Sequence, residues 1–113
     1  MKMNKDLIIN EFDKHFNDPK CELEYTKDYE LLLSVMLSAQ TTDKSVNMVT
    51  RELYKKYDTL DKLDTLTLDE IDNYIRSIGL HKTKSKYFKE IVTKIKEIGY
   101  VPNDREFLES FLI

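Results

Sequence analysis

Residues 37–47 read LSAQTTDKSVN, a polar segment of small residues that follows the apolar run LLLSVM at residues 31–36. The segment contains neither glycine nor proline. The hydroxyl of either Thr41 or Thr42 could accept a hydrogen bond from the first N–H groups of a helix, so both are suitable N-caps. Asp43 would then lie in the first helical turn, where the helix dipole stabilises a carboxylate. We therefore predict that a buried helix ends in this segment and that another begins there.

Helical periodicity extends from this segment in both directions. The preceding helix is apolar on nearly all sides, which is typical of a central helix, and it begins at Thr26 or Asp28. We expect the other helices at residues 4–16, 43–57, around Leu60 and Leu63, at 67–78 with Gly79 as a left-handed end, at 84–98 after a Thr83 cap and before Gly99, and from Asn103 onward. Thr67 and Glu70 have the spacing of a capping box.

Composition places the chain among all-α proteins. Its 113 residues suffice for one domain, and two glycines and two prolines leave few turn signals for hairpins.

A single cysteine, Cys21, cannot form an internal disulfide or hold a metal by itself, so no metal site is expected. The sequence has no signal-peptide pattern and no apolar run long enough to cross a membrane. We therefore expect a cytoplasmic protein that does not bind a membrane.

Charge is unevenly distributed along the chain, although the net charge is only −3. Residues 58–72 carry six acids and one lysine, whereas residues 76–96 carry seven basic residues and one glutamate. These runs could be two solvated helix faces, which is the commoner situation. The basic run could instead form a strip that contacts phosphates. Composition does not decide between these two interpretations.

Three segments in order resemble one family of enzymes: YELLLSVMLSAQTTDKSVN at residues 29–47, IRSIGLHKTKSKYF at 75–88 and VPNDREFLESF at 101–111. Together they are similar to the N-terminal half of endonuclease III, a helix-hairpin-helix DNA glycosylase and apurinic-site lyase. The resemblance implies an all-α, partial helix-hairpin-helix glycosylase fold that lacks the hairpin and the cluster domain. Residues 1–21 would be a helix that packs on the missing C-terminal domain, and residues 22–113 would form an incomplete six-helix domain.

The resemblance also implies roles for individual residues. Gln40 matches the glutamine that enters the space left by an everted base, and Leu80 matches the leucine that wedges the opposite strand. Asp43 matches a carboxylate of the base pocket, and Lys82 and Lys84 lie beside the wedge, where they could neutralise phosphates. Each residue also has a structural interpretation: a polar helix end for Gln40, an apolar contact at a glycine C-cap for Leu80, and a first-turn acid for Asp43. His81 is expected to be a surface or loop residue, and Ser34, where related adenine glycosylases carry glutamate, favours the pyrimidine-specific branch.

The printed residues depart from the family pattern at Phe111, and no catalytic residue can be assigned. The glycine-rich hairpin, the lysine nucleophile, the assisting aspartate and the four cysteines of the iron–sulfur cluster have no match, so we expect no cofactor in this chain. The resemblance predicts a truncated endonuclease III-like repair protein that is inactive alone. Its partner would be double-stranded DNA with a damaged pyrimidine or an abasic site. A non-catalytic DNA- or protein-binding module, or half of a split enzyme, is the alternative. The apolar residues 107–113 could also cause self-association.

Overall fold

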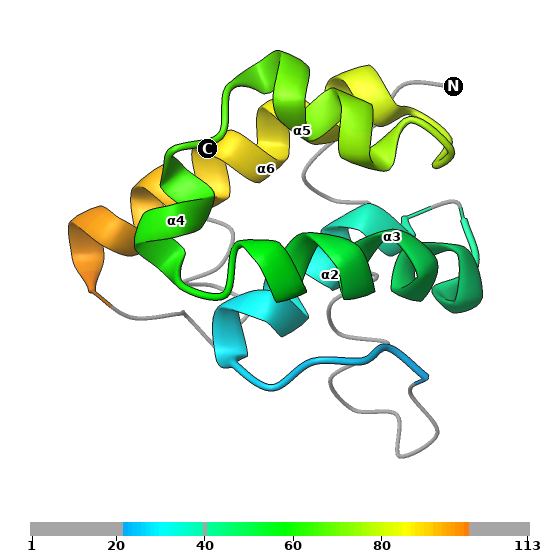
Figure 1. Cartoon of the computed structure of the whole chain (residues 1–113), viewed down its shortest axis with the longest axis horizontal. Coiled ribbons are helices and arrows are strands. Elements are labelled where there is room, and N and C mark those ends of the chain that lie inside the picture. Colours follow the sequence, from blue (N-terminus) through cyan, green and yellow to red (C-terminus); the bar gives the residue numbers. More distant parts are fainter. Residues whose placement is uncertain (1–21, 40, 100–113) are drawn as a thin grey trace.

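The computed structural model describes residues 22–39 and 41–99, and every regular element in these ranges is a helix. The elements are α2 (Asp28–Ser38), α3 (Asp43–Lys56), α4 (Leu60–Asp64), α5 (Leu68–Ile75) and α6 (His81–Ile98), as Figure 1 shows. The expected helices at 4–16 and after Asn103 lie outside the described residues. Within the described ranges, no helix is long and apolar enough to cross a membrane.

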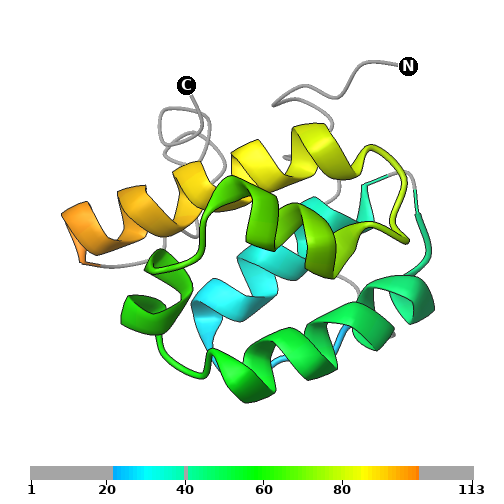
Figure 2. The ribbon, with the colours of Figure 1, turned by 45° about the horizontal axis from the view of Figure 1, so that its top comes forward.

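Helix α2 is the central element, as its apolar composition predicts. It lies between α3 and α6 and contacts both (Figure 2). Nearly all of its residues from Leu32 to Ser38 are buried, and they join buried residues of the other helices in a single apolar core. The later helices contribute buried residues to this core, among them Leu53, Leu63, Ile71, Phe88, Ile91 and Val92. Burial of these side chains supplies the main favourable free energy of folding.

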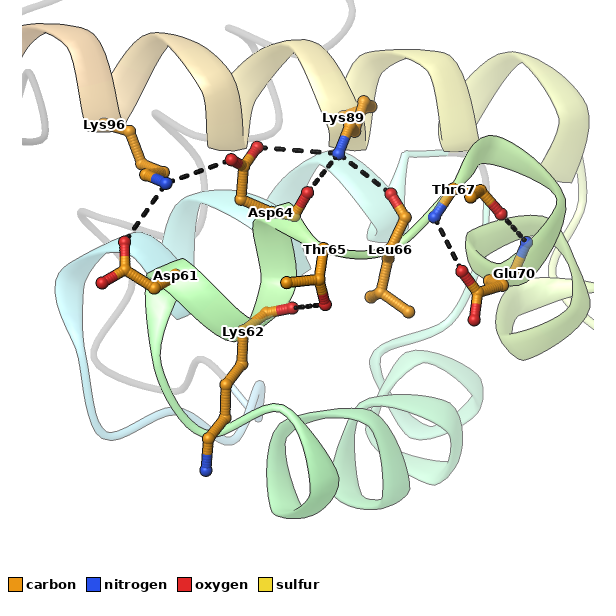
Figure 3. Close-up of polar contacts among 9 residues, drawn as sticks. All are labelled: Asp61, Lys62, Asp64, Thr65, Leu66, Thr67, Glu70, Lys89 and Lys96. Atoms are coloured by element: carbon orange, nitrogen blue, oxygen red, sulfur yellow. Dashed lines mark hydrogen bonds and ion pairs between the residues drawn. The ribbon is translucent and has the colours of Figure 1, made fainter.

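Three helices begin with threonine caps, and the sequence predicts two of them, Thr42 (as one of two candidates) and Thr67. The Thr42 hydroxyl accepts a hydrogen bond from the Ser45 N–H at the start of α3. Thr67 and Glu70 form the expected capping box at the start of α5, with reciprocal bonds of 3.0 and 3.2 Å (Figure 3). Thr59 caps α4. Helix α2 differs, because it begins at Asp28 after Lys27, which makes no side-chain cap.

Asparagine 47 attaches the segment before α2 to helix α3. Its side-chain oxygen accepts from the Glu24 N–H at 2.9 Å, and its amide nitrogen donates to the Glu22 carbonyl at 2.8 Å. Asn47 is 7% exposed, so both bonds are largely shielded from water. The last residue of the LSAQTTDKSVN segment thus has a structural function that joins positions more than twenty residues apart.

The end of α5 and the start of α6 differ from the sequence prediction. Helix α5 ends at Ile75, and Gly79 is not in the left-handed region, so the expected glycine stop is wrong. Leu80 is left-handed instead, with φ 62°, and α6 begins directly after it at His81 rather than after Thr83. At the other end, α6 runs to Gly99 as expected, and Gly99 is left-handed with φ 81°.

The two charge runs pair with each other at the end of the molecule that contains α4 (Figure 3). Lys96 contacts Asp61 at 3.2 Å and Asp64 at 3.1 Å. Lys89 lies 3.6 Å from the Asp64 carboxylate and donates to the backbone carbonyls of Asp64 and Leu66. Two lysines of the basic run, Lys89 and Lys96, therefore form ion pairs with the acidic run inside the same molecule. Neither sequence interpretation anticipated this pairing.

Candidate functional site

The segments that carry the candidate residues lie side by side at one end of the molecule. One is the α2–α3 corner, of which the structure describes Ala39, Thr41 and Thr42, and the other is the α5–α6 loop, residues 76–80. Both views show them next to each other, remote from α4 (Figures 1 and 2). Gln40 itself lies outside the described residues, whereas its neighbours Ala39 and Thr41 lie at the described ends of the corner. We call the corner, the loop and the first turn of α6 the loop end.

Leu80 has an unusual backbone conformation at the boundary between the loop and α6. A left-handed φ of 62° places its Cβ close to the following carbonyl, which costs roughly 1–2 kcal/mol for a residue other than glycine. Its side chain is half-buried and packs against the core. Such a conformation persists only where the surrounding structure determines it, and it occurs preferentially at functional sites.

A hydrogen-bonded pair of Asp72 and His81 joins α5 to α6 across this loop. The Asp72 carboxylate contacts His81 Nδ1, and both side chains are partly buried. Arg76 lies 4.0 Å from the same carboxylate and donates to the Asn73 side chain at 2.7 Å. His81, expected to be a surface or loop residue, is partly exposed at the start of α6, and its bond to Asp72 also closes the loop that contains Leu80.

Lys84 is not available to phosphates in this structure, and the sequence interpretation of it requires correction. Its side chain is fully buried, and its ammonium group donates to the Leu37 carbonyl at 2.8 Å. Lys84 lies a single turn after Leu80 on α6, so its side chain points into the protein while Lys82 and Lys86 are exposed. The charge run in the sequence could not reveal this difference in orientation, because the helix boundary at His81 was not recognised.

The other candidate residues occupy positions that leave their predicted roles open. Lys82 is exposed in the first turn of α6. Asp43 is half-buried at the first position of α3. Ser34 is fully buried, and its hydroxyl bonds to the Tyr54 hydroxyl at 3.0 Å. Burial raises the pKa of Tyr54 far above the usual value, so this phenol stays protonated and is part of the core.

The residues of this chain do not fit the iron–sulfur cluster that the resemblance implies. Such a cluster is held by four cysteine thiolates, and the sequence contains one cysteine. Among the described residues there is also no group of three or more histidine, cysteine, aspartate or glutamate side chains that could hold a metal ion. The chemistry of the described site is therefore that of an amphipathic surface with an apolar tip and nearby lysines.

Comparison with known proteins places this geometry in a family. Residues 33–109 match the family model described as HhH-GPD superfamily base excision DNA repair protein. Endonuclease III of Rickettsia felis is 45% identical over 100 residues, which cover 86% of this chain and 46% of that protein. Endonuclease III of Bacillus subtilis is 35% identical over 105 residues, which cover 91% and 48%. The chain thus spans about half the length of the curated relatives it matches.

Solved structures give the same result for the fold. A trapped endonuclease III–DNA covalent intermediate, described as an estranged-adenine complex, matches with a TM-score of 0.75 and 37% identity. The match covers 97% of this chain and 54% of that chain. A non-covalent endonuclease III–DNA complex matches with a TM-score of 0.74 and the same coverage. The predicted partial endonuclease III fold is confirmed, and the chain belongs to the HhH-GPD superfamily of base excision DNA repair proteins.

Proposed function

We propose that this chain recognises double-stranded DNA at an abasic site or a damaged pyrimidine, and that the loop end contacts the lesion. The observation that carries the proposal is the placement of Leu80. Its backbone is held in a costly left-handed conformation at the N-cap of α6, where the α5–α6 loop ends, and this loop lies beside the α2–α3 corner. The likeness to endonuclease III–DNA complexes supports DNA as the partner.

The physical task at a lesion is to replace the stacking and pairing that are lost when a nucleotide leaves the helix. An aliphatic side chain inserted between bases restores apolar contact, which is the role we assign to Leu80. An amide can hydrogen-bond to the unpaired base, which is the role we assign to Gln40. Asp43 would line the pocket for the everted base. Lys82, which is exposed two residues before the buried Lys84, would contact a phosphate.

Catalysis by the whole protein would be base excision and abasic-strand cleavage of the endonuclease III type. That chemistry requires an amine nucleophile that forms a Schiff base with the sugar. The printed 113 residues contain no match to the family's hairpin and its lysine. We therefore propose that this segment binds lesions but does not cleave them, and that it acts in the cytoplasm.

A binding and trapping experiment tests both parts of the proposal. Fluorescence anisotropy would compare a duplex carrying a tetrahydrofuran abasic analogue with the matched undamaged duplex. We expect a preference of about tenfold for the analogue, because an already unpaired nucleotide is cheaper to evert. Lys82→Glu should weaken binding to both duplexes and reduce its salt dependence. Equal affinities for the two duplexes would contradict lesion recognition.

Borohydride trapping tests the catalytic part separately. A duplex with a natural abasic site would be incubated with the 113-residue chain and sodium borohydride, and the products separated by denaturing electrophoresis. We expect no covalent protein–DNA complex and no strand cleavage above the level without protein. A trapped complex would show that one of the lysines in this chain is a nucleophile.

A further inference from the structure

Helix α2 ends without the residues that usually stabilise a helix C-terminus. Its last turn contains no basic residue, and its C-cap is Ala39, with φ −58° and ψ 118°, rather than a left-handed glycine. The last carbonyls of a helix have no N–H partners further along the same helix and carry the negative end of its dipole. Local groups satisfy several of these carbonyls, because the Ser38 hydroxyl donates to Val35, the Ala39 N–H to Met36 and the Thr41 N–H to Ser38. The helix end that precedes the corner therefore has local hydrogen bonds but no cation in its own last turn.

A lysine from another helix supplies the missing positive charge. The Lys84 ammonium donates to the Leu37 carbonyl in the last turn of α2, across a sequence separation of 47 residues. The bond is 2.8 Å long and is completely shielded from solvent. A cation at a helix C-terminus interacts favourably with the dipole, and more strongly where water is excluded. Lys84 thus links the first turn of α6 directly to the end of α2.

We propose that Lys84 is a positioning residue that fixes the α2–α3 corner relative to Leu80. The inference rests on the proposed function, since it concerns the two segments that would enter the lesion together. Leu80 lies at the N-cap of α6, one turn before Lys84. A single side chain, that of Lys84, therefore connects the start of α6, where Leu80 lies, to the end of α2, where the corner begins. Insertion of two groups into one gap requires their separation to be held closely, because small displacements are costly when several contacts must form at once.

The energetics of burial distinguish this role from simple stabilisation. A buried ammonium pays a large desolvation cost, which its removal recovers, whereas the Leu37 carbonyl that loses this donor costs free energy, so the two effects partly offset each other. Lys84→Met keeps most of the side-chain length and removes the charge. We therefore expect this variant to remain folded, while the corner loses its attachment to α6.

The first experiment measures lesion preference by the anisotropy assay, with variants of the 113-residue chain. Lys84→Met should reduce the preference for the abasic analogue by about tenfold, the effect of one charged hydrogen bond, and change the affinity for undamaged duplex by less than about twofold. Lys84→Arg retains a donor and should restore at least part of the preference. Lys86→Met removes the same charge from an exposed position two residues away and should leave the ratio of the two affinities unchanged. An unchanged ratio in Lys84→Met would overturn the proposal.

The second experiment requires no DNA, so it separates failure of this inference from failure of the proposed function. Amide hydrogen exchange would be followed by NMR in wild type and Lys84→Met. Exchange at the corner, reported by Ala39 and Thr41, should accelerate by about tenfold, while the core amides of Ile91 and Val92 should keep their rates. Unchanged corner exchange would overturn the positioning role, even if the wild type prefers damaged DNA.

A measurement on the wild type covers the case in which Lys84→Met does not fold. Native-state exchange in increasing urea would follow the corner and the first turn of α6. If Lys84 joins them, their amides should open together with the same dependence on urea. Opening of the corner at urea concentrations where the first turn of α6 stays closed would contradict the proposal.

Discussion

The loop end and the α4 end of the molecule use the same device in two different environments. At each end, a lysine of α6 donates to backbone carbonyls at the end of another helix: Lys84 to Leu37, and Lys89 to Asp64 and Leu66. Lys89 is partly exposed and has an aspartate beside it, whereas Lys84 is fully buried. The α4 end also has hydroxyl caps within its own sequence. The loop end has a hydroxyl cap as well, Thr42, but it also contains the distant bond from Lys84 to Leu37 and the strained Leu80, an arrangement typical of functional regions.

The largest effect that this comparison predicts concerns Asn47, which joins distant backbone groups near the corner. Asn47→Ala takes away the acceptor of the Glu24 N–H and the donor to the Glu22 carbonyl. We expect the free energy of unfolding to fall by about 2–3 kcal/mol, because both groups lose partners in a shielded position. Urea denaturation followed by circular dichroism measures this change.

Asn73→Ala is the matched control for that substitution. Asn73 is exposed on α5 and bonds to the exposed Arg76 within its own segment. Its replacement should change stability by less than about 0.5 kcal/mol. Similar losses in both variants would remove the distinction between long-range and local contacts.

A second prediction tests the strain at Leu80. Leu80→Val places a β-branched residue in the left-handed region and should lower stability by about 1–2 kcal/mol. Leu80→Gly removes the strain but also the apolar contact, so its stability should lie within about 1 kcal/mol of wild type. Thermal unfolding of the two variants gives the comparison. Leu80→Val equal in stability to wild type would show that the loop adjusts easily and is not constrained.

The two glycines provide a third, smaller contrast. Gly99 is left-handed, so Gly99→Ala should lower stability by about 1 kcal/mol. Gly79 is not left-handed, and an added Cβ would meet no atom within 4 Å. Gly79→Ala should therefore be neutral or stabilise by about 0.4–1 kcal/mol through the unfolded state. Equal destabilisation by both substitutions would contradict the backbone conformation described here.

The smallest predicted effect is the pH dependence of the α4 end. The backbone N–H of Thr67 lowers the pKa of Glu70 below 4.5, and the Lys96 ammonium lowers the pKa of Asp64 below 3.8. Because both folded-state values are depressed, the stability that these groups provide is present above their unfolded values and is lost as the pH falls through the folded ones. Tm should therefore decline below about pH 5. Glu70→Gln keeps the capping geometry but removes one titrating group, so its decline should be shallower; an identical decline would exclude Glu70 as a contributor.

Sequence-based prediction succeeds where the signal is local and fails where packing or a distant partner decides. The capping box of Thr67 and Glu70 and the stop at Gly99 are local signals that are confirmed, and Thr42 is one of the two caps that the sequence offers for α3. The left-handed residue was assigned to Gly79 because glycine usually adopts that conformation, whereas packing imposes it on Leu80. The sequence around Lys84 suggests a surface residue, and its burial could not be foreseen because its partner, the Leu37 carbonyl, lies 47 residues away. The last turn of α2 contains no basic residue, and this feature of the sequence could have indicated that a cation from elsewhere approaches the helix end.

The most direct test of lesion recognition uses 2-aminopurine placed opposite an abasic analogue in a duplex. Its fluorescence increases when stacking is lost, so it reports whether a side chain displaces the unpaired base. Wild type should increase the fluorescence on binding, and Leu80→Gly, at concentrations that saturate the duplex, should not. The account would be contradicted if both proteins gave the same increase, or if saturating wild type gave none.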